Sequence, residues 1–377
     1  MIKVLTQMNR KLKFGLLVGS LLLYGQQEGF AQSNLKEGNN HFALYTKSGD
    51  FKILEKARDF SDKAYVTGKD STSDRNNMLR SLVYSSLAVA DSNRTLKYSK
   101  DPIQVAVDAL NHLQDPDYND ENQQQIFYVR KNLANAYLAL SRKSLSNNKY
   151  EEALEHLQQV DRYNDGALQV KHNLAVISRK LGKTREAIQY YKAFMEQEEE
   201  AKPAYYLVLS KMYLAVQEDA EALNTLQEGR DRFPDNREIL FSILNVCADN
   251  GSYTQVASLI DEAIEMEPDN VALNYLAGYA NEVVGDFDKA YKYYKRVVKL
   301  DENNYKGNLE LGLLYLKEYL QKQEEEKEIN AQKYLLKANE IDPNAENALK
   351  SLAILFEQTG NSIQLERVQN QLNQNTF

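Results

Sequence analysis

The chain has 377 residues and a formal net charge of −8 at pH 7, an acidic balance that disfavours binding to nucleic acids and to anionic membrane surfaces. Cys247 is the only cysteine, which excludes an intramolecular disulfide and leaves stability to packing. Six prolines and sixteen glycines in a chain of this length favour helices.

Residues 1–31 have the three parts of a secretory signal peptide. A basic stretch from Lys3 to Lys13 precedes an uncharged apolar run over residues 14–24, and the small residues Gly29 and Ala31 suit a signal peptidase. The apolar run is about half as long as a membrane-spanning helix. We therefore expect secretion across the inner membrane into the periplasm and a mature chain that begins near Gln32, without an integral membrane span. Retention of the segment as a membrane anchor is the alternative.

Residues 32–125 predict an irregular helical region. Apolar residues recur at helical spacing over residues 51–65, 79–90 and 103–113. Asp101 followed by Pro102 is typical of a capped helix start, because Pro at the first helical position gives up an amide that has no partner there. We expect two helix pairs in this region, the first of which shields the end of the segment that follows.

Internal repetition at an interval of 34 residues is the most informative feature of the sequence. The recurring elements are Pro234-Asp235-Asn236 and Pro268-Asp269-Asn270, Gly251 and Gly285, and Gly278 and Gly312. A fixed period of this length indicates a solenoid in which each unit packs on its neighbours.

Each period predicts a pair of antiparallel helices. Between residues 271 and 304, small and polar residues from Asn274 to Asn281 mark one face of a first helix, and Gly285 ends it. Ala290, Tyr294 and Val297 then mark one face of a second helix. The small residue Gly278 allows the two backbones to approach closely, and Tyr294 fills the space beyond it.

Four consecutive units resemble the tetratricopeptide repeat family. The residues that carry the resemblance are Tyr206, Leu209, Ser210, Tyr213, Ala222, Leu226, Gly229 and Pro234; Leu240, Ile243, Leu244, Cys247, Val256, Ile260, Ala263 and Pro268; Asn274, Ala277, Gly278, Asn281, Ala290, Tyr294 and Val297; and Asn308, Leu311, Gly312, Tyr315, Ala331, Leu335, Ala338 and Pro343. The resemblance implies an all-α fold, a right-handed superhelical solenoid of antiparallel helix pairs.

Extending the repeat in both directions gives the expected domain organisation. A degenerate form of the repeat occupies residues 32–125, six units occupy residues 126–345, and a capping repeat occupies residues 346–377. The units and the cap begin near Phe127, Leu168, Pro203, Arg237, Val271, Tyr305 and Glu346. Insertions near residues 140–150 and 318–330 should lengthen their helices into protruding pairs, and such insertions are candidate partner surfaces.

The resemblance also implies that one face of each first helix lines a concave groove. The candidate partner-binding residues are Tyr128, Lys131, Asn135, His172, Asn173, Arg179, Lys180, Lys211, Asn245, Asp249, Tyr275, Tyr279 and Glu282. Along the chain this groove passes from basic to acidic and aromatic. Three of its residues, Lys131, Asn135 and Asn173, match a carboxylate clamp known in the family, but Ala204 and Val208 stand where the clamp has its other two residues.

No motif for catalysis, a metal or a cofactor accompanies the repeats. The four histidines lack metal-ligand spacing, and Cys247 falls at a core position of the repeat. We therefore expect a non-catalytic scaffold or adaptor of the cell envelope that binds protein partners through the groove or the protruding helices. The alternatives are a structural component of an envelope or secretion complex that self-associates, and a carbohydrate-associated binding protein.

Overall fold

The structure, a computed structural model, describes residues 29–92, 94–164 and 167–374. These ranges contain helices and turns without a strand, so the all-α fold class is confirmed. The predicted signal peptide lies outside them, apart from residues 29–31, which begin the first helix. In the described part of the chain, no helix combines the length and the apolarity that crossing a membrane requires.

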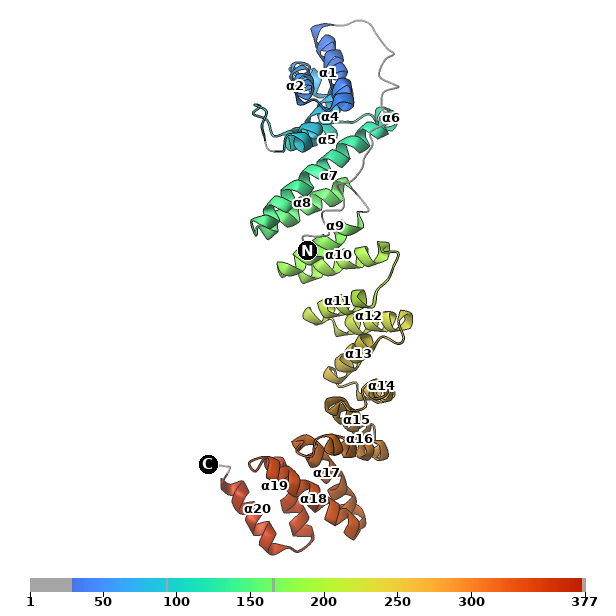
Figure 1. The fold of residues 1–377 in the computed structure, drawn as a ribbon, viewed down its shortest axis with the longest axis vertical. Helices are drawn as coiled ribbons and strands as arrows, with labels where there is room; N and C mark the ends of the chain where they lie inside the picture. The colour runs from blue at the N-terminus through green and yellow to red at the C-terminus, as the bar shows by residue number, and fades with distance from the viewer. Residues whose placement is uncertain (1–28, 93, 165–166, 375–377) are drawn as a thin grey trace. The chain divides into compact units, whose positions relative to one another are not determined.

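The helices form two compact units, which meet in sequence between Glu198 and Glu199 and are described separately below. Figure 1 colours them from blue to green and from green to red. The helices of unit 1 are α1 (Gly29–Ser48), α2 (Phe51–Lys63), α3 (Gly68–Ser71), α4 (Asp74–Ala90), α5 (Pro102–Asn111), α6 (Pro116–Glu121), α7 (Gln123–Ser146), α8 (Tyr150–Tyr163), α9 (Leu168–Lys180) and α10 (Thr184–Gln197).

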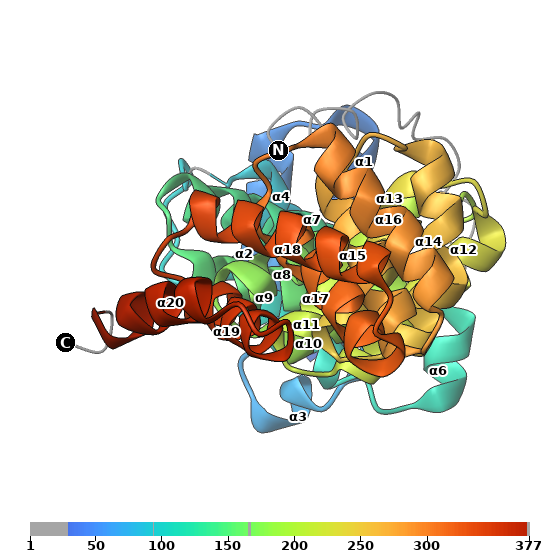
Figure 2. The ribbon, with the colours of Figure 1, turned by 90° about the horizontal axis from the view of Figure 1, so that it is seen from below.

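Unit 2 is a helical repeat solenoid in which each helix packs on its neighbours in sequence. Its helices are α11 (Pro203–Ala215), α12 (Asp219–Arg232), α13 (Arg237–Asp249), α14 (Tyr253–Met266), α15 (Val271–Val283), α16 (Phe287–Leu300), α17 (Tyr305–Lys322), α18 (Glu325–Ile341), α19 (Glu346–Gln358) and α20 (Ser362–Gln374). The last two lie side by side at the C-terminal end of the unit (Figures 1 and 2).

The recurring asparagines of the repeat start its first helices. The side chains of Asn236, Asn270 and Asn304 each accept a hydrogen bond from the backbone amide three residues later, at 3.0, 3.0 and 2.9 Å. Such a side chain satisfies one of the amides that have no partner at a helix start. The 34-residue spacing of these caps therefore fixes where α13, α15 and α17 begin.

Equivalent positions of the first helices in unit 2 share one interior. Leu209, Ile243, Ala277 and Leu311 follow one another at intervals of 34 residues, and all four are buried. Behind them, the fully buried ring of Tyr294 packs against Gly278. Because each first helix buries the same face, the opposite face of each is left to the solvent.

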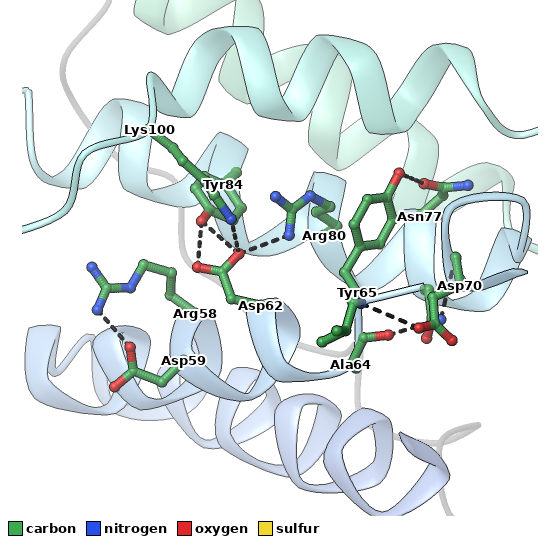
Figure 3. Close-up of polar contacts among 12 residues, drawn as sticks. Arg58, Asp59, Asp62, Ala64, Tyr65, Asp70, Asn77, Arg80, Tyr84 and Lys100 are labelled. Carbon is green, nitrogen blue, oxygen red and sulfur yellow. Dashed lines mark hydrogen bonds and ion pairs between the residues drawn. The ribbon is translucent and has the colours of Figure 1, made fainter. Parts of the chain in front are cut away.

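In unit 1, a charged network ties helix α2 to the elements that follow it (Figure 3). The carboxylate of Asp62 accepts hydrogen bonds from Arg80, Lys100 and Tyr84 at 2.8–2.9 Å. Burial by itself raises the pKa of Asp62, but the bonds from Lys100 and Arg80 outweigh burial and hold that pKa below its usual value. Arg80 is almost fully buried, so this carboxylate compensates a charge that would otherwise be costly.

The two predicted insertions differ in their effect on the helices. The first lengthens α7 to 24 residues, but its partner α8 keeps 14, so the predicted lengthened pair is wrong there. At the second, both helices are longer, with 18 residues in α17 and 17 in α18. The acidic run over residues 324–326 lies exposed at the start of α18, where negative charge is favoured by the helix dipole. Negative charge at these positions therefore stabilises the start of α18. The grouping of the helices into six repeat units and a capping repeat stays a prediction.

The close approach at Gly278 predicts the effect of one methyl group. In the variant Gly278→Ala, the added carbon would lie 2.5 Å from the Tyr294 ring, which has no room to move, so we expect a loss of about 1–3 kcal/mol of stability. The control Gly68→Ala adds a methyl that meets no atom within 4 Å. Urea unfolding followed by circular dichroism measures both, and equal midpoints would contradict the packing argument.

Candidate functional site

The first helices of unit 2 expose the same positions in successive units. The ninth residue of α11, α13 and α15 is exposed in each case, and so is the thirteenth residue of α11, α13, α15 and α17. These residues are Lys211, Asn245 and Tyr279 in the first row, and Ala215, Asp249, Val283 and Lys317 in the second. We call the two rows together the first-helix face. The 34-residue repeat places them in register, because every first helix buries its opposite side.

The centre of the first-helix face is apolar. Tyr279 is 37% exposed and Val283, one helical turn later, is 53% exposed. Across the turn to α16, Val284 and Phe287 are also exposed, and the ammonium group of Lys317 lies 4.2 Å from the centre of the Phe287 ring. We call Tyr279, Val283, Val284 and Phe287 the apolar patch. Exposed apolar side chains that lie together are typical of interaction surfaces.

Predicted residues Tyr275 and Glu282 lie in a half-buried carboxylate cluster beside this face. The Tyr294 hydroxyl donates to Glu282 at 2.9 Å, and the Tyr275 hydroxyl donates to Glu310 at 3.4 Å. Burial and the charge of Glu282 raise the pKa of Glu310. Burial, together with the Glu282 carboxylate, raises the pKa of Tyr294 as well. Tyr275 and Glu282 therefore bond to other residues of the protein, whereas Tyr279 is partly exposed and its ring meets that of Tyr253 edge-on at 5.0 Å.

In unit 1, the predicted residues of α7 have different surroundings. Tyr128 is half-buried, its ring meets Phe42 edge-on, and its hydroxyl lies 3.0 Å from the Ser86 hydroxyl. It is thus engaged with α1 and α4. Lys131 is half-buried and Asn135 is exposed on the same helix.

The predicted residues of α9 range from half-buried to exposed. His172 packs against Phe194, and burial lowers its pKa. Asn173 accepts a hydrogen bond from its neighbour Gln169 at 3.3 Å. Arg179 and Lys180 are exposed, and the Lys180 ammonium group lies over the ring of Tyr150, 4.1 Å from its centre.

The predicted site residues divide between the two units. Lys131, Asn135 and Asn173 belong to unit 1, whereas Ala204 and Val208, at the other two clamp positions, belong to unit 2. The carboxylate clamp, and a single groove that runs from basic to acidic along the whole chain, stay predictions. Within unit 2, the structure places Lys211, Asn245, Asp249 and Tyr279 on the first-helix face.

Sequence reasoning did not select the apolar members of the face. Val283 and Lys317 follow Asp249 at successive intervals of 34 residues, so the repeat itself contained the signal. The predicted groove residues at these positions are polar or aromatic, and the aliphatic Val283 is not among them. The neighbouring Phe287 lies beyond the end of the first helix, where the repeat spacing gives no guide to exposure.

Models of the tetratricopeptide repeat match residues 248–305 and 172–202. These stretches carry tetratricopeptide repeats. A curated relative, tetratricopeptide repeat protein 8 of Caenorhabditis elegans, is 24% identical over 143 residues, which are 38% of this chain and 28% of the relative's length.

Solved structures with tetratricopeptide repeats are also similar to the chain. YrrB, described as a TPR protein with an unusual peptide-binding site, is 18% identical with a TM-score of 0.41, and the match covers 53% of this chain and 98% of YrrB. The C-terminal part of a TPR repeat-containing protein from Cytophaga hutchinsonii is 17% identical with a TM-score of 0.47, covering 62% of this chain and 92% of that one.

The carboxylate cluster predicts a stabilising substitution. Because the pKa of Glu310 is raised in the folded protein, its ionised form opposes folding at neutral pH. The variant Glu310→Gln should therefore unfold at a higher temperature than the parent chain at pH 7, and the difference should disappear as the pH falls below the ordinary glutamate pKa of 4.5. Thermal unfolding measured across this pH range tests it. A gain that persists in acid would contradict the electrostatic cause.

Proposed function

We propose that the chain is a non-catalytic scaffold that binds a segment of a partner protein along the first-helix face of unit 2. The observation that carries the proposal is the repeated exposure of Lys211, Asn245 and Tyr279 at one position of the first helices of three successive repeats, α11, α13 and α15. Their helices are fixed by buried residues on the opposite side, so the first-helix face loses little conformational entropy when a partner binds. Tetratricopeptide repeats in general serve as protein-binding scaffolds, which supports the same reading.

The chemistry of the face suggests how a partner is held. The apolar patch offers Tyr279 and Val283 to an apolar side chain, and tyrosine is favoured at protein interfaces because a large apolar ring carries a polar end. Asp249 on α13 and Lys317 on α17 lie on the neighbouring helices to either side. The partner segment is therefore expected to present an apolar anchor flanked by a basic and an acidic group.

We also propose that this scaffold acts in the cell envelope, because the sequence predicts a secretory signal. The support is the basic stretch, short apolar run and small residues of the first 31 positions. Proteins of the envelope are the partners that a periplasmic scaffold would meet.

A photoreactive amino acid introduced at two positions tests the binding surface. Val283 and Ile329 are similarly exposed, at 53% and 58%, but Ile329 lies on α18, outside the first-helix face. After irradiation of intact cells, the label at position 283 should give a discrete adduct with another protein, and the label at 329 should not. Adding Asp249→Ala should reduce that adduct severalfold.

The same experiment tests location. The adduct should be recovered in the envelope fraction, with Gln32 as the first residue of the chain. Identical adducts at 283 and 329, or none at 283, would contradict the binding surface. A recovered chain that retains Met1 would contradict cleavage of the signal and leave the surface standing.

A further inference from the structure

Helix α16 is strongly basic although the chain is acidic. Its 14 residues include five lysines or arginines and a single acid, Asp288, whereas the whole chain has a formal net charge of −8. Two of the five basic residues make ion pairs with the preceding repeat. The Lys289 ammonium group lies 3.0 Å from Asp261, and Arg296 pairs with Asp269. These pairs leave three lysines of the helix without an explanation.

The three remaining lysines form one exposed face of α16. Lys292, Lys295 and Lys299 follow one another at intervals of three and four residues, which places them within about 10 Å along one side of the helix. Lys292 acts electrostatically on Asp261, but none of the three forms an ion pair with a residue that the structure describes. We call Lys292, Lys295 and Lys299 the basic face.

The packing of the repeats does not require basic residues at these positions. The equivalent residues are Ser258, Asp261 and Glu265 one period earlier, and Asn224, Gln227 and Asp231 two periods earlier. The carboxylate of Asp261 joins two repeats, because it accepts hydrogen bonds from Lys289 and Tyr293 of the next unit. Lys295 stands at the equivalent position and makes no hydrogen bond with the described residues of the unit that follows. Positive charge at the basic face therefore has no role in joining one repeat to the next.

The basic face lowers the stability of its own helix. Like charges that lie three or four residues apart on a helix repel each other, and Lys295 has Lys292 and Lys299 at these two spacings. A bound group of opposite charge removes this repulsion. Side chains that oppose stability in the free protein are expected at functional surfaces, so the arrangement favours a role in binding.

A hollow of about 340 Å³ adjoins the basic face. It is lined by Asp288, Tyr291, Lys292, Lys295, Tyr315 and Lys327. The Lys295 ammonium group lies 5.7 Å from the centre of each of the two tyrosine rings, and the Lys327 ammonium group lies 5.9 Å from Tyr291 and 5.5 Å from Tyr315. Lys327 is bound to Glu318 at 2.7 Å, so its charge is compensated. Lys295 is exposed and has no such partner in the described part of the chain, so a carboxylate from outside can reach it.

We propose that the basic face binds an acidic helical segment of a partner protein, in which carboxylates recur at intervals of three and four residues. Carboxylates at this spacing lie along one side of the partner helix and match the spacing of Lys292, Lys295 and Lys299. One of them enters the hollow beside Lys295. The surface belongs to the second helix of a repeat, and it is separate from the first-helix face, which belongs to the first helices.

Charges around the basic face favour a short acidic segment over an extended polyanion. Asp288 lies one helical turn before Lys292, and the acidic run over residues 324–326 directly precedes Lys327. A membrane surface or a nucleic acid would bring further phosphates against these carboxylates, and the acidic chain as a whole would repel it. A short segment meets the lysines alone.

Fluorescence anisotropy of labelled peptides titrated with the full chain tests the proposal. The probe is an alanine-based helical peptide with glutamates at intervals of three and four residues. A second peptide has the same composition but distributes its glutamates around the helix, and a third has glutamine in place of glutamate. At low salt the probe should bind at least about threefold more tightly than the second peptide, because only the probe presents its charges on one side. The third peptide should not bind, and added salt should weaken the probe.

Variants separate recognition from folding. The triple variant Lys292→Gln, Lys295→Gln and Lys299→Gln should weaken the probe about tenfold, since it removes three exposed ion pairs that each contribute little. Its thermal unfolding midpoint should be unchanged or higher, because the repulsion between the lysines is gone. A residue with only a structural role would not combine weaker binding with undiminished stability.

A matched control removes the same charge from one helix of unit 1. Lys52, Lys56 and Lys63 are exposed on α2. The control variant Lys52→Gln, Lys56→Gln and Lys63→Gln should bind the probe like the parent chain, because it changes the net charge of the protein equally but leaves the basic face intact.

Four results would overturn the proposal. They are absence of probe binding at low salt, equal affinity for the probe and the second peptide, unchanged binding by the triple variant, and an equal loss of binding in the control variant.

Two further measurements decide against other occupants. If the parent chain but not the triple variant bound phosphatidylglycerol vesicles or duplex DNA more tightly than the probe, the basic face would belong to an extended polyanion. If sedimentation showed a dimer that the triple variant loses, the occupant would be a second copy of the chain. Either result would overturn the proposal. The photoreactive label at position 283 reports on the first-helix face alone, so failure of the basic face leaves the proposed scaffold function intact, and the converse also holds.

Discussion

The packing of the two helices of a repeat against each other, with close approaches in α15/α16 and α17/α18, is the constraint on which the rest of unit 2 depends. At Gly278 the backbone of α15 lies against the ring of Tyr294, and at Gly312 the backbone of α17 lies against Leu335. A side chain at either glycine would push the helices apart. In these two pairs the large residue of one helix fills the place that the small residue of the other leaves, whereas α13 has the buried Leu244 at the equivalent position.

This packing determines which side chains are available for function. Once the core rows of the first helices face inward, the exposed positions on their far side can vary in chemistry, as the change from Lys211 to Asn245 to Tyr279 shows. Residues nearer the core are drawn into internal bonds, as Tyr275 and Glu282 are. In unit 1, a pocket of about 360 Å³ is lined by the irregular helices α5 and α6 together with α7 and α8, which belong to the first predicted repeat.

The fold class was predictable because its cause is local and repeated. A 34-residue spacing, a cap such as Asn270 and a small residue such as Gly278 act within one unit or between neighbours, so the pattern in the sequence is sufficient. The surroundings of single side chains were less predictable. The half-burial of Tyr128 depends on Phe42, 86 residues earlier, and no periodicity connects the two. The pocket around Tyr163 likewise joins residues from four helices without a shared spacing.

Removal of one whole period tests the central claim most directly. A chain that lacks residues 237–270 joins Asn236 to Val271, so that the sequence Pro-Asp-Asn again precedes α15 and Asn236 takes the capping place of Asn270. Circular dichroism should show that this chain keeps its helical content per residue and unfolds cooperatively, whereas a chain that lacks residues 237–260 should lose helix throughout unit 2. If the two deletions behaved alike, the units would not be interchangeable modules on a common core, and the exposed rows would have no structural basis.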